Sequence, residues 1–162
     1  MKTRILAAIC LAATLTTSCD LDEKFYSSVT PETFITRPEN TYAILSRPFT
    51  HWKWYIGGER WYLQELTSDE FCCPSRGNDF YNNGEYIRLQ EHTWTPTDRF
   101  IVSTYDGTLS GVARSLEAYE DLAGVDYAAI GMDEATKQAH LNQLNTIIGY
   151  FYMRGLDYLV VS

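Results

Sequence analysis

The segment from residue 71 to residue 97 concentrates side chains that suit a ring-shaped, hydroxyl-rich ligand. It is rich in Pro, Gly, Asn and Asp, and it also holds Arg76, Asn78, Asp79, Phe80, Tyr81, Trp94 and Thr97. An aromatic ring can stack on the C–H face of a pyranose, while planar polar groups bind paired hydroxyls. A structural alternative is that Trp94 pins the loop to the core and that Arg76 pairs with Asp69 or Glu70. The residues alone leave both interpretations open.

Asp69 and Glu70 are the strongest hint of catalysis, because glycosidases use two carboxylates. Those carboxylates flank the scissile bond about 5–9.5 Å apart, whereas adjacent residues point in different directions. His51, His92 and His140 lack the spacing of metal ligands, and the sequence has no nucleophile elbow and no glycine-rich phosphate loop. The sequence therefore predicts a protein that is not an enzyme and that uses no cofactor and no metal.

The N-terminus has the layout of a secretory signal peptide. Lys2 and Arg4 precede an apolar run at residues 5–15, which is too short to span a bilayer comfortably. Small residues then lead into Cys19, a pattern that resembles a bacterial lipobox with its aliphatic residue, Leu15, displaced by one position. We expect Cys19 to be acylated and to anchor the mature protein, since about two acyl chains give stable attachment. The alternative is a plain cleaved signal that leaves Cys19 as a free thiol.

An acidic stretch follows Cys19. Asp20, Asp22 and Glu23 resemble the acidic tag with which Bacteroidetes-type bacteria export lipoproteins to the cell surface, and they are equally typical of a solvated linker. The formal net charge of the chain is −8, and loss of Lys2 and Arg4 with residues 1–18 lowers it to −10. An acidic domain without a basic stripe is a poor candidate for binding nucleic acid.

Two other cysteines, Cys72 and Cys73, are adjacent in the sequence. A disulfide between them would be strained, since ordinary bridges hold Cα atoms ~4.4–6.8 Å apart. No further cysteine or nearby histidine completes a zinc pattern. Buried thiols and a local vicinal bridge are both left open, and the pair is not interpreted as a site.

The first half of the chain predicts short helices and one long loop. Pro38 marks the first turn of a helix that has Thr36 near its cap and Tyr42 and Leu45 on its buried face. A second helix runs from Glu59 to about Leu66 after a Gly-Gly break, and residues 71–96 form a long structured loop. Core packing is expected for a further set of aromatic side chains: Trp52, Trp54, Trp61 and Tyr62.

The second half predicts two long amphipathic helices. Asp98 caps one that ends near Leu122 and has apolar residues at Ile101, Tyr105, Leu109, Val112, Leu116 and Tyr119. Asp133 caps the other, whose apolar face holds Leu141, Leu144, Ile147, Ile148, Phe151, Gly155, Tyr158 and Leu159. Such a pair is the αα-hairpin of tetratricopeptide-type solenoids, which need about three repeats or more. The sequence stops at "LDYLVVS" in mid-helix, so we expect a fragment of a longer helical protein.

Several segments together resemble the N-terminal part of the SusD/RagB family, the surface glycan-binding lipoproteins of gut-type Bacteroidetes. The similar segments are "SCDLDEKFYSSVTPETFI", "ELTSDEF", "PSRGNDFYNNGEYIRLQEHTWTP", "YDGTLSGVARSLEAYEDL" and "LNTIIGYFYMRGLDYLVV". Two features depart from the family pattern: Thr104 stands where tryptophan is common, and the usual asparagine pair near Arg114 and Ser115 is absent. Family members are also several times longer than this chain.

The resemblance implies a mostly α fold of tetratricopeptide-like hairpins with long irregular loops. It implies a lipoprotein on the outer membrane, exposed at the cell surface, that captures oligosaccharide for a SusC-like TonB-dependent transporter. By position in the signature, Arg76 and Trp94 are the expected glycan contacts, followed by Asp69 and then Thr97. An interaction lipoprotein that binds the transporter or a peptide, without its own sugar site, is the alternative; a lipoprotein glycosidase is a remote one.

The expected domain organisation follows from these features. Residues 1–18 form the signal peptide, residues 19–30 the lipidated cysteine and acidic tether, and residues 31–162 the N-terminal part of a SusD-like helical domain.

Overall fold

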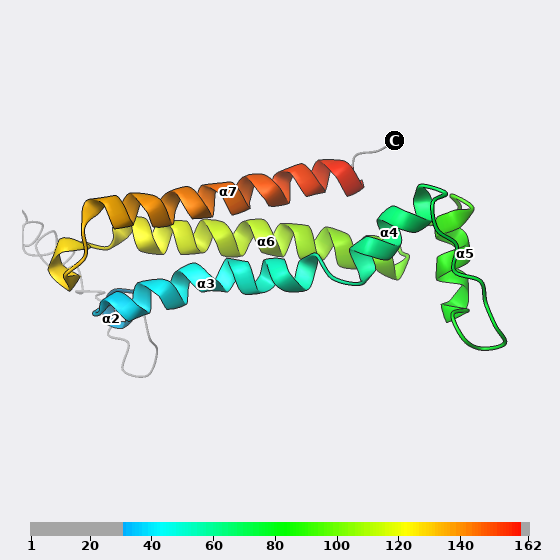
Figure 1. Cartoon of the computed structure of the whole chain (residues 1–162), viewed down its shortest axis with the longest axis horizontal. Helices are drawn as coiled ribbons and strands as arrows, with labels where there is room; N and C mark the ends of the chain where they lie inside the picture. The colour runs from blue at the N-terminus through cyan, green and yellow to red at the C-terminus, as the bar shows by residue number, and fades with distance from the viewer. Residues whose placement is uncertain (1–30, 160–162) are drawn as a thin grey trace, which may run out of the picture. The chain divides into compact units, whose positions relative to one another are not determined.

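The computed structural model describes residues 31–159, and these residues form a mostly helical domain (Figure 1). The elements are α2 (Pro31–Phe34), α3 (Pro38–Tyr55), α4 (Glu59–Thr67), η1 (Asn82–Gly84), α5 (Glu85–Gln90), α6 (Arg99–Gly124), η2 (Ala128–Ile130) and α7 (Glu134–Leu159). The predicted mostly α fold class is confirmed. The signal peptide, the lipidation site at Cys19 and the acidic tether lie outside the described residues.

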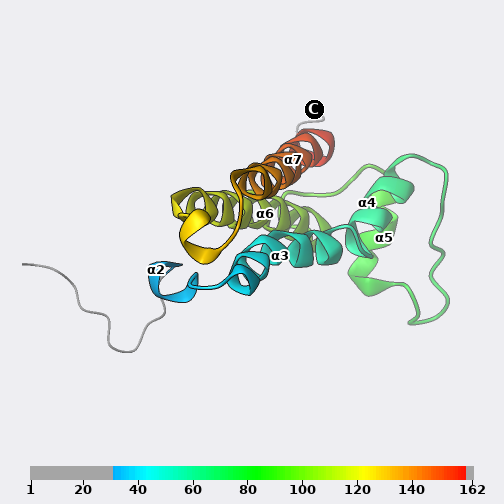
Figure 2. The ribbon, with the colours of Figure 1, turned by 60° about the vertical axis from the view of Figure 1, so that its left-hand side comes forward.

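Three long helices, α3, α6 and α7, lie side by side, with α6 antiparallel to both of the others (Figures 1 and 2). The close approach depends on small residues along the buried face of α6, namely Thr104, Gly107, Thr108, Gly111 and Ser115. The Phe151 ring of α7 lies against Gly111, and the Tyr55 ring of α3 lies against Gly107. The absence of a Cβ at these two glycines is therefore what allows aromatic side chains to fill the helix interfaces.

Three apolar clusters follow one another along the helices. The first joins α3, α6 and α7 through Ile35, Leu45, Ala118, Leu122, Leu141 and Leu144. The second joins the same helices through Tyr55, Val112, Ile147 and Phe151. The third fastens α4 and α5 to the start of α6 through Leu63, Leu66, Leu89 and Phe100. The third cluster holds the segment around residues 71–97 against the helices, although most of that segment is exposed.

The predicted extents of α6 and α7 are confirmed to within two or three residues. Of the six apolar residues noted along α6, Val112 is buried, Ile101 and Tyr119 are partly buried, and Tyr105, Leu109 and Leu116 are exposed. Tyr42 of α3 is exposed as well, whereas Leu45 is buried as expected. The physical reason is that helix–helix distance is set by the small residues of α6, so its large side chains lie on the other faces.

The two predicted helix caps behave differently. The Asp133 carboxylate accepts a hydrogen bond of 2.7 Å from the backbone N–H of Thr136, which confirms this cap. Asp98 stands at the N-cap position of α6 but makes no capping hydrogen bond to the helix. Its carboxylate instead accepts two hydrogen bonds from the Arg88 guanidinium, of 2.6 and 2.9 Å, and one from the backbone N–H of Thr95. These bonds tie α5 to the start of α6 and hold the pKa of Asp98 below its usual range.

The predicted long loop at residues 71–96 is interrupted by α5, a helix that the sequence pattern did not predict. The helix is short, and only Leu89 is fully buried, so it has little hydrophobic periodicity to detect. Earlier in the loop, Arg76 and Asp79 exchange two backbone hydrogen bonds, of 3.0 and 3.1 Å. Gly77 within this turn has a φ of 64°, a conformation that glycine adopts without strain.

Candidate functional site

A groove of about 660 Å³ opens beside Trp94. Its walls come from α4, the segment before α6, and the last turn of α7, and its lining residues are Leu63, Gln64, Thr67, Ser68, His92, Trp94, Ile101, Asp157, Tyr158 and Leu159. We call it the Trp94 groove. It combines aromatic rings with hydroxyl, amide and carboxylate groups. Such a mixture fits a ligand that has both apolar and hydroxyl-bearing faces.

The indole of Trp94 is 36 % exposed, and its ring centroid lies 5.4 Å from that of His92. His92 adopts a φ of 57°, so the chain turns sharply just before the tryptophan. The backbone N–H of Thr93 donates to the carbonyl of Arg88, which fixes this turn to the end of α5. Trp94 is thus held at one edge while part of its ring remains open to the groove.

Other residues that line the groove carry hydrogen-bonding groups. The Tyr158 hydroxyl donates to Oε1 of Gln64 at 3.3 Å, which links α7 to α4. Burial raises the pKa of Tyr158 further above neutral, where a phenol already keeps its proton, so the hydroxyl is a donor. Asp157 accepts a hydrogen bond of 2.8 Å from Arg154 on the preceding turn. The sequence did not single out Gln64, Asp157 and Tyr158 as site residues, because nothing in their spacing indicates that α4 and α7 meet here.

The four predicted glycan contacts do not gather in one place. Trp94 lines the groove, but Arg76 and Asp69 do not, and Thr97 lines a separate hollow beside Trp54. Arg76 and Asp69 are exposed, and among the described residues neither side chain makes an ion pair or hydrogen bond. The suggested internal pairing of Arg76 with Asp69 or Glu70 is therefore not formed in this structure.

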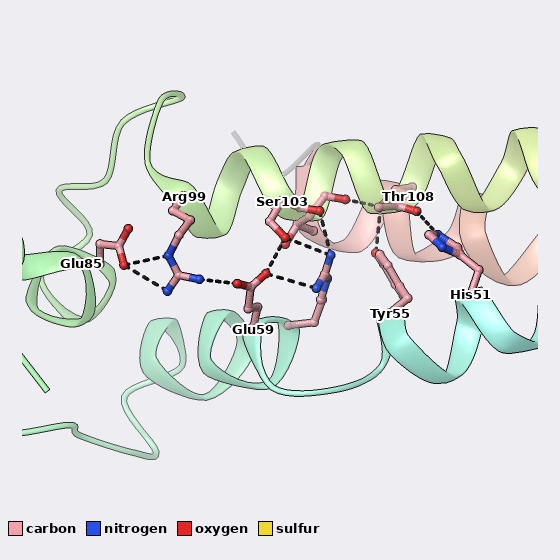
Figure 3. A network of polar contacts seen from close by, with 10 residues as sticks. His51, Tyr55, Glu59, Glu85, Arg99, Ser103 and Thr108 are labelled. Carbon is pink, nitrogen blue, oxygen red and sulfur yellow. Dashed lines mark hydrogen bonds and ion pairs between the residues drawn. The ribbon is translucent and has the colours of Figure 1, made fainter. Parts of the chain in front are cut away.

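A network of charged groups lies along the junction of α3, α4 and α6 (Figure 3). Arg60 is buried, and its guanidinium donates to the Ser103 carbonyl at 2.7 Å and to Glu59 at 3.3 Å. Glu59 also accepts from the Ser103 hydroxyl and from Arg99, and Arg99 in turn binds Glu85 of α5 at 3.1 Å. Burial lowers the pKa of Arg60, and the adjacent Glu59 opposes that shift.

The network continues along α3 through neutral groups (Figure 3). The Tyr55 hydroxyl and the Thr108 hydroxyl are 2.8 Å apart, and Thr108 donates to the carbonyl of Thr104. Nε2 of His51 lies 2.8 Å from the carbonyl of Gly107. Burial lowers the pKa of His51, which favours the neutral ring that donates to this carbonyl. These contacts fix α3 against α6 and are structural in character.

The predicted aromatic core is only half confirmed. Trp52 and Tyr62 are partly buried and pack against the apolar clusters, as expected. Trp54 is 55 % exposed and Trp61 is 45 % exposed, so the core interpretation is wrong for these two side chains. Both rings lie at the margin of a packing contact, Trp54 near Gly107 of α6 and Trp61 near Phe71, so each keeps about half of its surface in solvent.

The two alternatives left open for Cys72 and Cys73, a pair of buried thiols and a vicinal bridge, are both wrong. Both residues are free thiols; Cys72 is exposed and Cys73 is partly buried, and burial raises the pKa of the Cys73 thiol. No cluster of three or more potential metal ligands occurs between residues 31 and 159. None of the described helices combines the length and apolar character needed to cross a bilayer.

We found no match to the chain among protein-family models, curated proteins or solved structures.

Proposed function

We propose that this chain belongs to a lipid-anchored, surface-exposed protein that binds oligosaccharide and delivers it to a TonB-dependent outer-membrane transporter of the SusC type. The Trp94 groove is the single observation that best supports binding. The resemblance of the sequence to SusD/RagB lipoproteins supports the transporter as partner, and the lipobox-like sequence at Cys19 supports the outer membrane as location. A tetratricopeptide-like arrangement of the helices is part of the same proposal.

The chemistry of the groove fits capture rather than reaction. Trp94 offers a partly open ring for stacking, and Gln64, Ser68 and Tyr158 in the same lining offer hydrogen-bonding groups. Among the described lining residues the only carboxylate is Asp157, which is already bound to Arg154, whereas glycoside hydrolysis needs a pair. We therefore propose binding without catalysis and keep the lipoprotein glycosidase as the remote alternative.

A second candidate function is an interaction lipoprotein without a sugar site of its own. Exposed apolar side chains favour it: Tyr105, Leu109 and Leu116 on α6, and Tyr152, Met153 and Leu156 on α7. Such side chains are unusually large for a solvated helix face and are common at protein interfaces. A transporter subunit or a peptide would be the partner in that case.

The decisive experiment is a glycan-binding screen on the full chain in detergent, with Trp94→Ala in parallel. We expect at least one oligosaccharide to bind and the substitution to weaken it about tenfold, equivalent to ~1.4 kcal/mol. Trp61→Ala is the matched control, since this exposed tryptophan does not line the groove. If Trp94→Ala bound the glycan with unchanged affinity, the Trp94 groove would not be the binding site. A folded chain that binds no glycan would favour the interaction lipoprotein, and reducing ends released over time would favour the glycosidase.

A further inference from the structure

Trp54 is an exposed tryptophan whose position is unusually well fixed. The Arg60 guanidinium carbon lies 4.4 Å from the centre of its ring, and the His51 ring centroid lies 5.2 Å away. A Cβ on Gly107 would come within 3.2 Å of the Trp54 ring, so the glycine permits this close approach of α3 to α6. Even so, 55 % of the Trp54 side chain is exposed. A rigid ring of this kind gives contact area at low entropic cost.

Two hollows meet at Trp54, and we call them together the Trp54 groove. One measures about 440 Å³ and is lined by Trp54, Thr97, Arg99, Val102, Ser103 and Asp106. The other measures about 300 Å³ and is lined by His51, Trp54, Asp106, Gly107, Ser110 and Arg114. Trp54 and Asp106 belong to both, so the groove runs along α6 on either side of this pair. Thr97, a predicted glycan contact, thus lines this groove and does not line the Trp94 groove.

The groove holds charged groups that are not engaged elsewhere. Asp106 and Arg114 make no hydrogen bond and no ion pair to any other residue that the structure describes. Arg99, by contrast, is bound to Glu59 and Glu85, and His51 to the Gly107 carbonyl. Asp106 can therefore accept, and Arg114 can donate, hydrogen bonds to a ligand without giving up an internal partner. An open aromatic ring beside a free carboxylate and a free guanidinium suits a pyranose, whose C–H face stacks and whose hydroxyls bind.

We propose that the Trp54 groove is a second oligosaccharide subsite, in which Trp54 stacks on a sugar ring and Asp106 and Arg114 bind its hydroxyls. The inference rests on the proposed function but concerns different residues from those of the Trp94 groove. The polar network beneath the groove positions it: Arg60 supports the Trp54 ring from below while its own charge is balanced by Glu59. A second subsite lets one chain hold a long glycan at two points, which raises avidity.

The test is fluorine NMR of the full chain in detergent, with all four tryptophans replaced by 5-fluorotryptophan. Single Trp→Phe variants assign the resonances of Trp52, Trp54, Trp61 and Trp94. The probes are hexasaccharides of α-glucan, β-glucan, β-mannan and pectin. We expect at least one of them to shift the Trp54 resonance while that of Trp61 stays unchanged. Asp106→Asn and Arg114→Gln should each raise the Kd read from the Trp54 resonance fivefold or more, whereas Glu120→Gln, an exposed change on the same helix, should leave it unaltered.

The outcomes separate this proposal from the proposed function. A glycan that shifts the Trp94 resonance but not that of Trp54 overturns the second subsite and leaves glycan binding standing. A Trp54 shift that is insensitive to Asp106→Asn and Arg114→Gln also overturns the subsite, because the ring would then be reporting an indirect change. If no probe shifts either resonance in a folded chain, both proposals fall.

Discussion

Trp54 and Trp94 show how the surroundings of a tryptophan determine whether its ring is open to solvent. Each ring is held on one side, Trp54 by the Arg60 guanidinium and Trp94 by the His92 ring, and each keeps a surface open to solvent. Trp52, only two residues from Trp54, packs against Tyr150 of α7 and is partly buried. Amino-acid type alone does not distinguish these cases; the direction of the side chain from its helix does.

His140 provides a residue-scale prediction about pH. It is buried in the domain, its Nδ1 lies 3.0 Å from the Tyr127 hydroxyl, and burial lowers its pKa. The unfolded chain, with a histidine pKa of about 6.5, then binds more protons than the folded one at slightly acidic pH. The free energy of unfolding should fall as the pH drops through about 6.5 toward the lower pKa of the folded state.

Urea unfolding between pH 8 and pH 5 measures this effect. His140→Gln should flatten the pH dependence, and the remaining slope should reflect His51, whose pKa burial also lowers. His92→Gln, at an exposed position, controls for loss of a histidine elsewhere. A His140→Gln variant that kept the full wild-type slope would show that this ring does not control acid stability.

At the scale of the helices, Gly107 and Gly111 determine how closely α6 approaches its neighbours α3 and α7. A Cβ at Gly111 would overlap the ring of Phe151, which is fully buried and cannot swing away. Gly111→Ala should therefore lower the free energy of unfolding by about 1–3 kcal/mol through overpacking. Thermal or urea unfolding measures the change.

Gly149 of α7 is the matched control for Gly111. It is exposed, and no heavy atom of another part of the chain lies within 4 Å of the place that an added Cβ would occupy. Gly149→Ala should raise stability by about 0.5–1 kcal/mol, because alanine favours the helix. Equal effects at both positions would contradict close packing at Gly111.

The junction between α4 and α6 depends on Glu59. This carboxylate offsets the buried Arg60 and also binds Arg99 and Ser103, so its removal leaves a buried cation without its counter-charge. Glu59→Gln should lower the free energy of unfolding by about 1–3 kcal/mol, less than for a fully buried pair because Glu59 is itself partly exposed. Chemical unfolding at a fixed ionic strength measures the loss.

The Arg47–Glu117 ion pair supplies the control for this prediction. Both side chains are about half exposed, so Glu117→Gln should cost under about 1 kcal/mol. A larger loss for Glu117→Gln than for Glu59→Gln would refute the assigned role of Glu59.

At the scale of the whole molecule, the described helices leave apolar side chains in solvent. Tyr105 and Leu109 of α6 and Tyr152 and Leu156 of α7 are each about half exposed or more. The three long helices do not bury all of their apolar side chains among themselves, and a protein partner such as the transporter is the proposed cover.

Substitution of Cys19 tests the proposal that the protein is anchored in the outer membrane. In a bacterium with a lipoprotein-sorting pathway, the wild-type chain should take up labelled palmitate and sediment with the outer membrane. Cys19→Ser should lose both the label and the membrane association, because one acyl-bearing residue supplies the anchor. Cys72→Ser, which removes an exposed thiol in the described part of the chain, should keep both. Label that persists in Cys19→Ser would show that acylation occurs elsewhere.

Local sequence signals were sufficient to predict the helical class, the extents of α4, α6 and α7, the Pro38 start of α3 and the Asp133 cap. These signals are helical periodicity, proline at the first turn and a carboxylate within reach of nearby N–H groups. They did not reveal α5, whose single buried leucine gives too weak a pattern. They also did not indicate that small residues form much of the buried face of α6, because apolar periodicity is detected from large side chains while close helix packing selects small ones.

Which residues share a site depends instead on the packing of the whole domain. Trp94 lines one groove with Gln64 and Tyr158 because α4 and α7 converge at one end of α6, and Thr97 lines another with Trp54 because α3 passes beside the start of α6. Those residues are separated by tens of positions in the sequence, so no local spacing relates them. Their proximity follows from the helix distances that Gly107 and Gly111 set, and contacts of this range form only when the helices pack together.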